Sequence, residues 1–247
     1  MRCPFLRKST VMDDRLKESL WFYTGADYMI INAFLWINKE AMDPCIGIVW
    51  QNNRDVIREA KEEGPENRFA FSGLDGAALF ESYRRRTPAE LTNEAKRDIL
   101  HQAITDIRLI CDSMHPIREP VRLFRNMEAA FCLKNIREGE QVDLLGLTST
   151  STTGQQINYG QNNFRKPAQI LQIDVPSGLP ALFLENDEHE VLLPPMRYRV
   201  KGEHIEDGVL TVSLDACQPL ELERLIQSAT EAFAELFDVH KQDTARR

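Results

Sequence analysis

The chain has 247 residues, of which 43% are hydrophobic and 28% are charged, and its formal net charge is −8 at pH 7. This composition is typical of a globular protein with enough apolar residues for a sizeable core, and it excludes a compositionally disordered chain. The acidic balance argues against a general nucleic-acid surface, so no nucleic-acid partner is expected and basic partner surfaces are preferred.

No export signal or membrane span is visible in the sequence. The N-terminal residues are basic, but no apolar core follows them as a secretory signal would require. The longest apolar stretch, residues 20–37, is interrupted by Gly25, Asp27 and Asn32, whereas a spanning helix needs ~20 predominantly apolar residues. We expect a cytoplasmic protein without membrane insertion, or one delivered into a target cell by a route independent of a signal peptide.

The five cysteines are odd in number, widely scattered and without a C-x-x-C pair. This pattern predicts neither a disulfide framework nor a zinc site, so no metal is expected. The residues are Cys3, Cys45, Cys111, Cys132 and Cys217.

The N-terminal part of the chain, about residues 12–115, has the apolar periodicity of helices. Turn residues at Pro44, Gly64-Pro65 and 73–76 separate the helical segments. The basic run 84–86 is interpreted as a solvated face, because three such residues in an acidic protein usually point to water. The expected helices cover residues 12–18, 28–36, 55–63 and 88–112.

Beyond Pro120 the pattern changes to short strands, which form a β core over about residues 120–215. A C-terminal helix is expected over about residues 219–240, with apolar residues on one side. Helices followed by strands indicate an α+β fold. The expected strands cover residues 121–125, 141–150, 168–175, 181–184, 191–193, 198–206 and 209–214.

Glu188 and Glu190 lie two residues apart at the start of an apolar strand. Alternate side chains of a strand share a face, so the two carboxylates point the same way, repel each other and attract a cation. A guanidinium or an oxocarbenium ion fits this requirement. A solvated turn in front of the strand is the alternative interpretation.

Two upstream segments carry polar residues on short strands. Arg125 lies within Leu-Phe-Arg-Asn-Met, and Ser149 begins the Ser-Thr-Ser run at residues 149–151. The order Arg, Ser-Thr-Ser, Glu-x-Glu resembles that of the arginine-specific mono-ADP-ribosyltransferases, which include the enzymatic subunits of binary toxins and vertebrate ecto-enzymes. The separations between these motifs also agree with that family.

A fourth match lies in the first quarter of the chain, where Tyr23-Thr24-Gly25-Ala26-Asp27-Tyr28 leads to Asn32. The resemblance covers roughly residues 15–215, and we expect residues 1–247 to form one ADP-ribosyltransferase-like domain. Its helical N-terminal half would pack on a split, mixed or antiparallel β-sandwich followed by the C-terminal helix.

The resemblance also implies a role for each residue of the polar motifs. Arg125 would bind the pyrophosphate and ribose of NAD, a task that suits a planar, permanently charged fork. Arg122 is a rival for that role, and a surface ion pair is the alternative for either residue. Ser149 would support the catalytic Glu190. Asn126 stands where the family usually has glycine, and asparagine tolerates unusual backbone angles better than most residues.

Aromatic and amide side chains are the remaining candidates for binding NAD. Family members stack an aromatic ring on nicotinamide at a position that corresponds best to Phe164, with Tyr159 second. A hydrophobic plug under the loop is the alternative for Phe164. Tyr28 and Asn32, four residues apart on a helix, would lie near the nicotinamide mononucleotide half, with core packing as the alternative.

The implied activity is the transfer of ADP-ribose from NAD to an arginine side chain of a target protein, with release of nicotinamide. Glu190 would bind the ribose 2'-hydroxyl and stabilise an oxocarbenium-like ribose, and Glu188 would orient the acceptor guanidinium and take its proton. NAD is then a co-substrate. The alternatives are an NAD glycohydrolase on the same fold, a transferase with another acceptor residue, and an inactive binding module.

Overall fold

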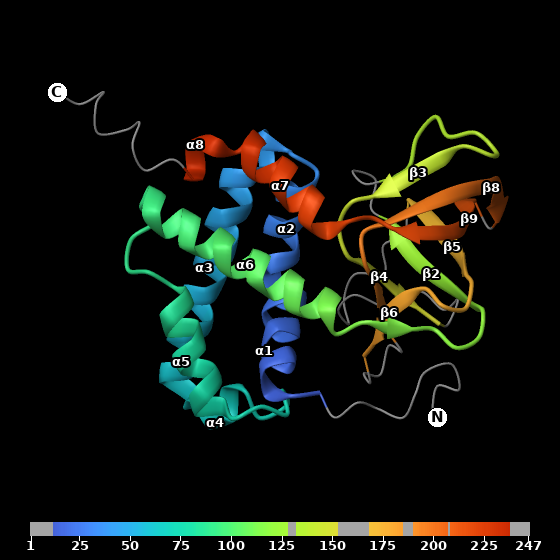
Figure 1. Cartoon of the computed structure of the whole chain (residues 1–247). Helices are drawn as coiled ribbons and strands as arrows, with labels where there is room; N and C mark the ends of the chain where they lie inside the picture. Colours follow the sequence, from blue (N-terminus) through green and yellow to red (C-terminus); the bar gives the residue numbers. More distant parts are fainter. Residues whose placement is uncertain (1–11, 128–131, 153–167, 185–189, 207, 238–247) are drawn as a thin grey trace. The chain divides into compact units, whose positions relative to one another are not determined.

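The computed structural model describes residues 12–127, 132–152, 168–184, 190–206 and 208–237 (Figure 1). The chain divides into two compact units. We call residues 1–10 and 113–221 the strand unit, and residues 11–112 and 222–247 the helical unit. The expectation of a single domain over residues 1–247 stays a prediction.

The helical unit begins where Asp13 caps the first helix, since its carboxylate accepts a hydrogen bond from the Leu16 amide at 2.8 Å. A π-helix joins this helix to the next one without a break. The elements are α1 (Asp14–Phe22), the π-helix η1 (Tyr23–Asp27), α2 (Tyr28–Leu35), α3 (Lys39–Glu63), α4 (Pro65–Arg68), α5 (Gly76–Arg86), α6 (Asn93–Asp112), α7 (Leu222–Ala232) and α8 (Ala234–Phe237).

The long helix α3 corrects the expected turn at Pro44. Its 25 residues run from Lys39 to Glu63, with Pro44 inside the helix. The missing amide of a proline is best tolerated near a helix start, and Met42, Ile46 and Val49 are buried along the same helix. Tertiary packing of this apolar face therefore outweighs the local preference for a turn.

Helix α5 was missed by the sequence pattern, because glycines precede it and arginines end it. Asp75 caps it by accepting from the amides of Ala77 and Ala78. The interpretation of residues 84–86 as a solvated face is wrong for Arg86, whose side chain is only 10% exposed. Arg84 does point to water, with its side chain 57% exposed.

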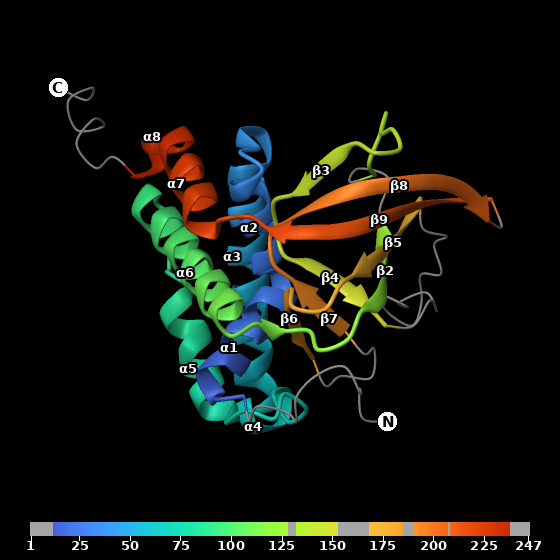
Figure 2. The ribbon, with the colours of Figure 1, turned by 45° about the vertical axis from the view of Figure 1, so that its right-hand side comes forward.

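The strand unit contains a nine-stranded mixed sheet in the order β1-β6-β7-β4-β2-β5-β9-β8-β3 (Figure 2). The β5–β9 pair is parallel and the other pairs are antiparallel. The strands are β1 (His115–Pro116), β2 (Val121–Met127), β3 (Gln141–Leu144), β4 (Thr148–Ser151), β5 (Gln169–Val175), β6 (Pro180–Phe183), β7 (Glu190–Leu193), β8 (Met196–Glu206) and β9 (Val209–Pro219).

The segment 141–150, expected as one strand, is two strands in different parts of the sheet. β3 pairs with β8 at one end of the order, and β4 pairs with β7 and β2 near the other end. Gly146 lies in the break between them. Apolar residues, Leu144, Leu145 and Leu147, continue across the break, so the segment looks like one strand although the alternation changes phase within it.

An apolar core lies within the described part of the strand unit. It includes Leu123 of β2, Leu171 of β5, Val191 of β7 and Tyr198 of β8. Strands from both ends of the sheet order contribute to this core. The α+β fold with a helical N-terminal part, a mixed sheet and a C-terminal helix is confirmed.

Candidate functional site

The pairing of β4 with β7 places the predicted serine and glutamate on one face of the sheet. Ser151 lies opposite Glu190, and Ser149 lies opposite Leu192. Directly opposed residues and alternate residues share a face, so Ser149 and Glu190 are diagonal neighbours. The Ser149 hydroxyl donates to Glu190 Oε1 at 2.5 Å. This bond fixes one carboxylate oxygen at the start of β7.

Thr150 holds the same two strands together from the other face. Its side chain is buried, and its hydroxyl donates to the backbone carbonyl of Val191 at 2.7 Å. A one-residue slip of β4 would turn Ser149 to the opposite face. The Thr150 bond therefore helps to keep Ser149 in register with Glu190.

Arg125 lies on β2, whose Phe124 is paired with Ser151. Strand alternation puts Arg125 on the core face with Leu123 and Met127, opposite to the face of Ser149. The guanidinium nevertheless reaches β4, because its Nη1 donates to the Ser149 carbonyl oxygen at 3.0 Å and its Nε contacts Met127 Sδ at 3.2 Å. Of the five donors of a guanidinium, these described contacts use two.

Arg122, the rival for the pyrophosphate role, lies in a different environment. Its Nε and Nη2 donate to Asp174 at 2.7 and 3.1 Å. Its side chain is 54% exposed. The carboxylate already neutralises this guanidinium, whereas the described contacts of Arg125 are with a carbonyl and a thioether.

Asn126 is an ordinary strand residue. It pairs with Ile170 of β5 and does not belong to the residues with a positive φ angle in the described part of the chain. The tolerance of asparagine for unusual backbone angles is therefore not used at this position. Its side chain points to the face opposite that of Arg125.

Tyr28 and Asn32 lie on α2, in the helical unit. Tyr28 is 43% exposed, so it is not a core residue, while Asn32 is partly buried. The backbone carbonyl of Asn32 accepts a hydrogen bond from the Trp36 amide at 3.0 Å. Their place beside the nicotinamide half of NAD stays a prediction.

Three predicted residues lie outside the described part of the chain. Glu188, Phe164 and Tyr159 fall in residues 185–189 and 153–167. Their roles stay predictions.

A buried ion cluster around Arg86 is the main polar feature that the sequence analysis missed. Arg86 of α5 contacts Asp106 of α6 at 2.6 Å and Asp27 of the π-helix at 3.5 Å. The three residues are far apart in sequence and have no shared motif. A weak signal exists in Asp106, which falls among the apolar positions of a helix pattern and so must be buried.

Within the described residues, no group of histidine, cysteine, aspartate and glutamate side chains could hold a metal ion. No helix in the same part of the chain is both long enough and apolar enough to cross a bilayer.

No protein-family model and no curated protein sequence matches the chain. Among solved structures, it is similar to Plx2a, an ADP-ribosyltransferase toxin from Paenibacillus larvae, with 14% identity over 68% of this chain and 97% of that one, at a TM-score of 0.39. The catalytic domain of VahC from Aeromonas hydrophila gives 15% identity over 83% of this chain and all (100%) of that one, at a TM-score of 0.45.

A third similar structure is the ADP-ribosyltransferase Vis in complex with agmatine. It gives 13% identity over 85% of this chain and 77% of that one, at a TM-score of 0.44. At these identities and TM-scores the similarities do not establish the family or the activity of this chain. The function proposed below therefore rests on the contacts among Arg125, Ser149 and Glu190.

Proposed function

We propose that this protein is a mono-ADP-ribosyltransferase that moves ADP-ribose from NAD to an arginine side chain of a target protein and releases nicotinamide. The observation that carries the proposal is the hydrogen bond from Ser149 to Glu190 at 2.5 Å, with Arg125 bound to the carbonyl of the same serine. Ser149 and Glu190 share one face of the adjacent strands β4 and β7, and the guanidinium of Arg125 on β2 reaches the backbone of Ser149. Their chemistry suits a substrate with phosphates and a ribose.

We assign Glu190 to the reacting ribose. Breaking the bond between C1' and the nicotinamide nitrogen sends the electron pair to nicotinamide and leaves positive charge on the sugar. A carboxylate stabilises that charge and accepts a hydrogen bond from the 2'-hydroxyl. Ser149 holds Oε1 of this carboxylate, so the carboxylate is oriented before the substrate binds.

We assign Arg125 to the pyrophosphate. A guanidinium presents parallel N–H donors that match phosphate oxygens. Its bond to the Ser149 carbonyl and its contact with Met127 fix the direction of the side chain. The distance between phosphate and ribose anchors is then set by the β2–β4–β7 pairing rather than by flexible loops.

Glu188 is assigned to the acceptor. It would orient the incoming guanidinium, whose nitrogen forms the new bond to C1', and would accept the proton that this nitrogen loses. Hydrolysis of NAD needs only the residues at the ribose and the phosphates. Substitution of Glu188 therefore distinguishes the transferase from an NAD glycohydrolase, in which water is the acceptor.

The proposal is tested by following nicotinamide release and label transfer to poly-arginine from labelled NAD. We expect Glu190→Gln to abolish both signals, because the amide lacks the charge that stabilises the ribose cation. Glu188→Gln should abolish transfer and leave hydrolysis. Release without transfer by the unmodified protein would favour the glycohydrolase or another acceptor residue, and no turnover would overturn the proposal.

A matched pair on β2 tests the phosphate role. Arg125→Lys keeps the charge but loses the fork, so KM for NAD should rise roughly tenfold or more. Arg122→Lys is the control on the same strand, because Arg122 is exposed and paired with Asp174. Equal effects of the two substitutions would contradict the assignment of Arg125.

A further inference from the structure

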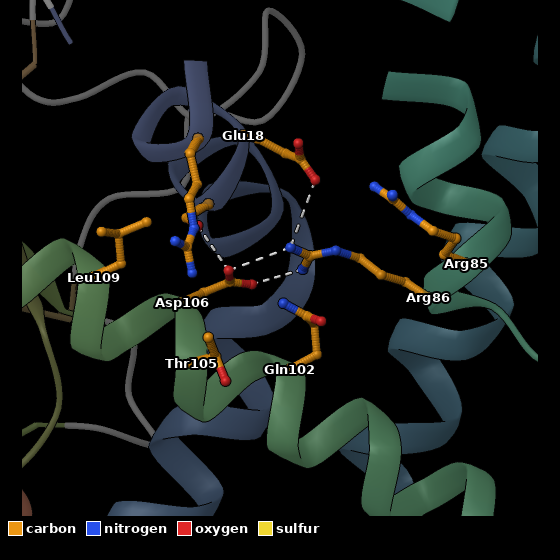
Figure 3. A pocket seen from close by; sticks show the side chains of 9 residues that line it. Glu18, Arg85, Arg86, Gln102, Thr105, Asp106 and Leu109 are labelled. Atoms are coloured by element: carbon orange, nitrogen blue, oxygen red, sulfur yellow. Dashed lines mark hydrogen bonds and ion pairs between the residues drawn. The ribbon is translucent and has the colours of Figure 1, made fainter. Parts of the chain in front are cut away.

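Arg86 is the centre of a buried ion cluster in the helical unit (Figure 3). Its Nη1 and Nη2 donate to the two carboxylate oxygens of Asp106 at 2.6 and 3.2 Å. The guanidinium also covers the ring of Phe22 at 3.6 Å from the centroid. The side chains of Arg86 and Asp106 are 10% and 4% exposed. This geometry fixes the direction of the guanidinium from two sides.

The carboxylates around Arg86 outnumber it. Asp27 Oδ2 lies 3.5 Å from Nη1, and Glu18 Oε1 lies 3.9 Å from Nη2. Asp106 is further supported by the Ser19 hydroxyl, which donates to it at 2.7 Å. Because Asp106 takes the bidentate position, Asp27 is a second and weaker partner of the same cation. An ionised Asp27 would therefore be a buried charge with incomplete compensation.

Asp27 is the last residue of the π-helix, directly before α2. π-Helices are rare and occur mostly at functional sites, where the extra residue changes the phase of the helix that follows. Here Asp27 is buried, whereas the next residue, Tyr28, is 43% exposed. Asn32 lies one turn further on the same side as Tyr28. The contact between Asp27 and Arg86 is thus a link between the cluster and the two residues assigned to NAD.

We propose that the cluster of Arg86, Asp106 and Asp27 is a positioning element. It stabilises the π-helix (residues 23–27) and thereby fixes the orientation of Tyr28 and Asn32 on the helix that follows. The assignment of Tyr28 and Asn32 to NAD rests on the proposed function, whereas the hold on the π-helix does not. In this arrangement residues 23–32 are most stable in their position when Asp27 is neutral. Ionisation of Asp27 weakens the hold.

The electrostatics of Asp27 agree with this arrangement. Burial raises its pKa to about 7, while Arg86 lowers the pKa and Asp106 raises it. The other titratable groups on the packed helices are Glu18 of α1, which contacts Arg86, and Tyr83 of α5, whose pKa is raised by burial and also by the charge of Asp27. Among the described residues, α3 contributes no charged group to the pKa shift of Asp27.

A polar cavity of about 220 Å³ adjoins the cluster. Glu18, Arg86 and Asp106 line it, and Figure 3 shows Arg86 pointing from α5 toward Asp106 on α6 at its wall. Arg15 and Arg85 are also part of the lining. The cavity brings solvent to the guanidinium side of the cluster, so protons have a short path to the network.

Hydrogen exchange of residues 23–32 tests the hold on the π-helix without NAD. After correction for intrinsic rates, protection in this segment should fall between about pH 6 and about pH 8 in the unmodified protein. Asp27→Asn keeps the size of the side chain and cannot ionise, so its protection should be the same at both values. Asp55→Asn on α3 is the control, because Asp55 is a surface partner of Arg58. The same fall in Asp27→Asn would overturn the proposal.

The pH profile of NAD kinetics tests the link to the substrate. KM should rise roughly threefold or more over the same range in the unmodified protein, with kcat nearly constant, and stay flat in Asp27→Asn. Arg86→Lys should raise KM at all pH values, whereas Arg84→Lys, which changes an exposed residue of the same helix, should not. Altered exchange with no NAD turnover in the unmodified protein would refute the proposed function; normal turnover with identical KM profiles would refute the positioning role.

Discussion

Ser149 and Glu190 act as one unit at the scale of single residues. The serine hydroxyl is the partner that directs a carboxylate oxygen of Glu190, at 2.5 Å. A carboxylate that must stabilise a transient cation works best when it is already oriented, because no reorganisation is then needed during the reaction. In the proposed transferase the serine would therefore contribute to the rate without a bond to the sugar.

Ser149→Ala should lower kcat by roughly 10- to 100-fold, which corresponds to the loss of a hydrogen bond to a charged group. KM for NAD should change much less, because Arg125 and the phosphate contacts remain. Steady-state rates of nicotinamide release measure both quantities. A variant with unchanged kcat would show that Glu190 needs no support from β4.

Tyr198, also in the strand unit, has a buried hydroxyl group. It is fully buried, and its hydroxyl interacts with the Thr148 side chain but makes no hydrogen bond of good geometry among the described residues. An unsatisfied buried hydroxyl costs about 1 to 3 kcal/mol. Tyr198→Phe should therefore raise the free energy of unfolding by about 1 kcal/mol, as measured by urea denaturation.

Tyr83→Phe is the matched control for Tyr198. The Tyr83 hydroxyl accepts a hydrogen bond from Trp21 Nε1 at 2.9 Å, so its removal leaves a donor unpaired. This substitution should lower the free energy of unfolding by about 1 kcal/mol. A loss of stability in both variants would mean that the Tyr198 hydroxyl has an effective hydrogen bond, with Thr148 as the candidate partner.

At the scale of elements, the C-terminal helix pair α7–α8 belongs to the helical unit. Phe233, between the two helices, is buried and stacks on Phe34 of α2 with ring centroids 5.8 Å apart. Arg108 of α6 also donates to both oxygens of Glu223 on α7 at 2.8 and 2.7 Å. The aromatic contact is the stronger anchor, because the ion pair is exposed to solvent.

Phe233→Ala should lower the free energy of unfolding by about 3 kcal/mol, since it removes a buried aromatic side chain and leaves a cavity. Phe71→Ala is the control, because Phe71 is fully exposed and should contribute almost nothing. Thermal or denaturant unfolding of the two variants gives the comparison. Similar stabilities would show that α7 is held by other contacts.

The sequence predicts that Ser149 and Glu190 lie close together, but it does not predict the contact that Arg125 makes. Strand alternation alone puts Ser149 and Ser151 on one face, and the pairing with β7 brings Glu190 to them. The position of Arg125 depends on the β2–β4 register, which no local pattern contains, so its bond to the Ser149 carbonyl was not predicted. Arg86 was misjudged for a similar reason, because its carboxylate partners come from other helices.

At the scale of the whole molecule, the charge of Asp27 makes stability depend on pH. The folded pKa of about 7 is above the ordinary value of 3.8, so the folded state binds more protons between these values. Stability should therefore be highest below about pH 4 as far as this residue is concerned, and should fall as pH rises through about 7. The upper limit of the effect is about 4 kcal/mol, at 1.36 kcal/mol per pKa unit.

Asp27→Asn should remove this part of the pH dependence. Unfolding free energies measured at several pH values would show a smaller decline for the variant than for the unmodified protein. Asp55→Asn should keep the original slope, because Asp55 is a surface residue paired with Arg58. Parallel curves for all three proteins would contradict a raised pKa for Asp27.

We propose that the strands β2, β4 and β7 build a transferase site for NAD and an acceptor guanidinium. Agmatine, which carries a guanidinium and little else, is the most direct acceptor for testing it. Mass spectrometry of agmatine after incubation with NAD should show an ADP-ribosyl adduct with the unmodified protein and none with Glu190→Gln. Equal adduct formation by the Glu190→Gln variant, or no adduct and no nicotinamide release with the unmodified protein, would contradict the claim.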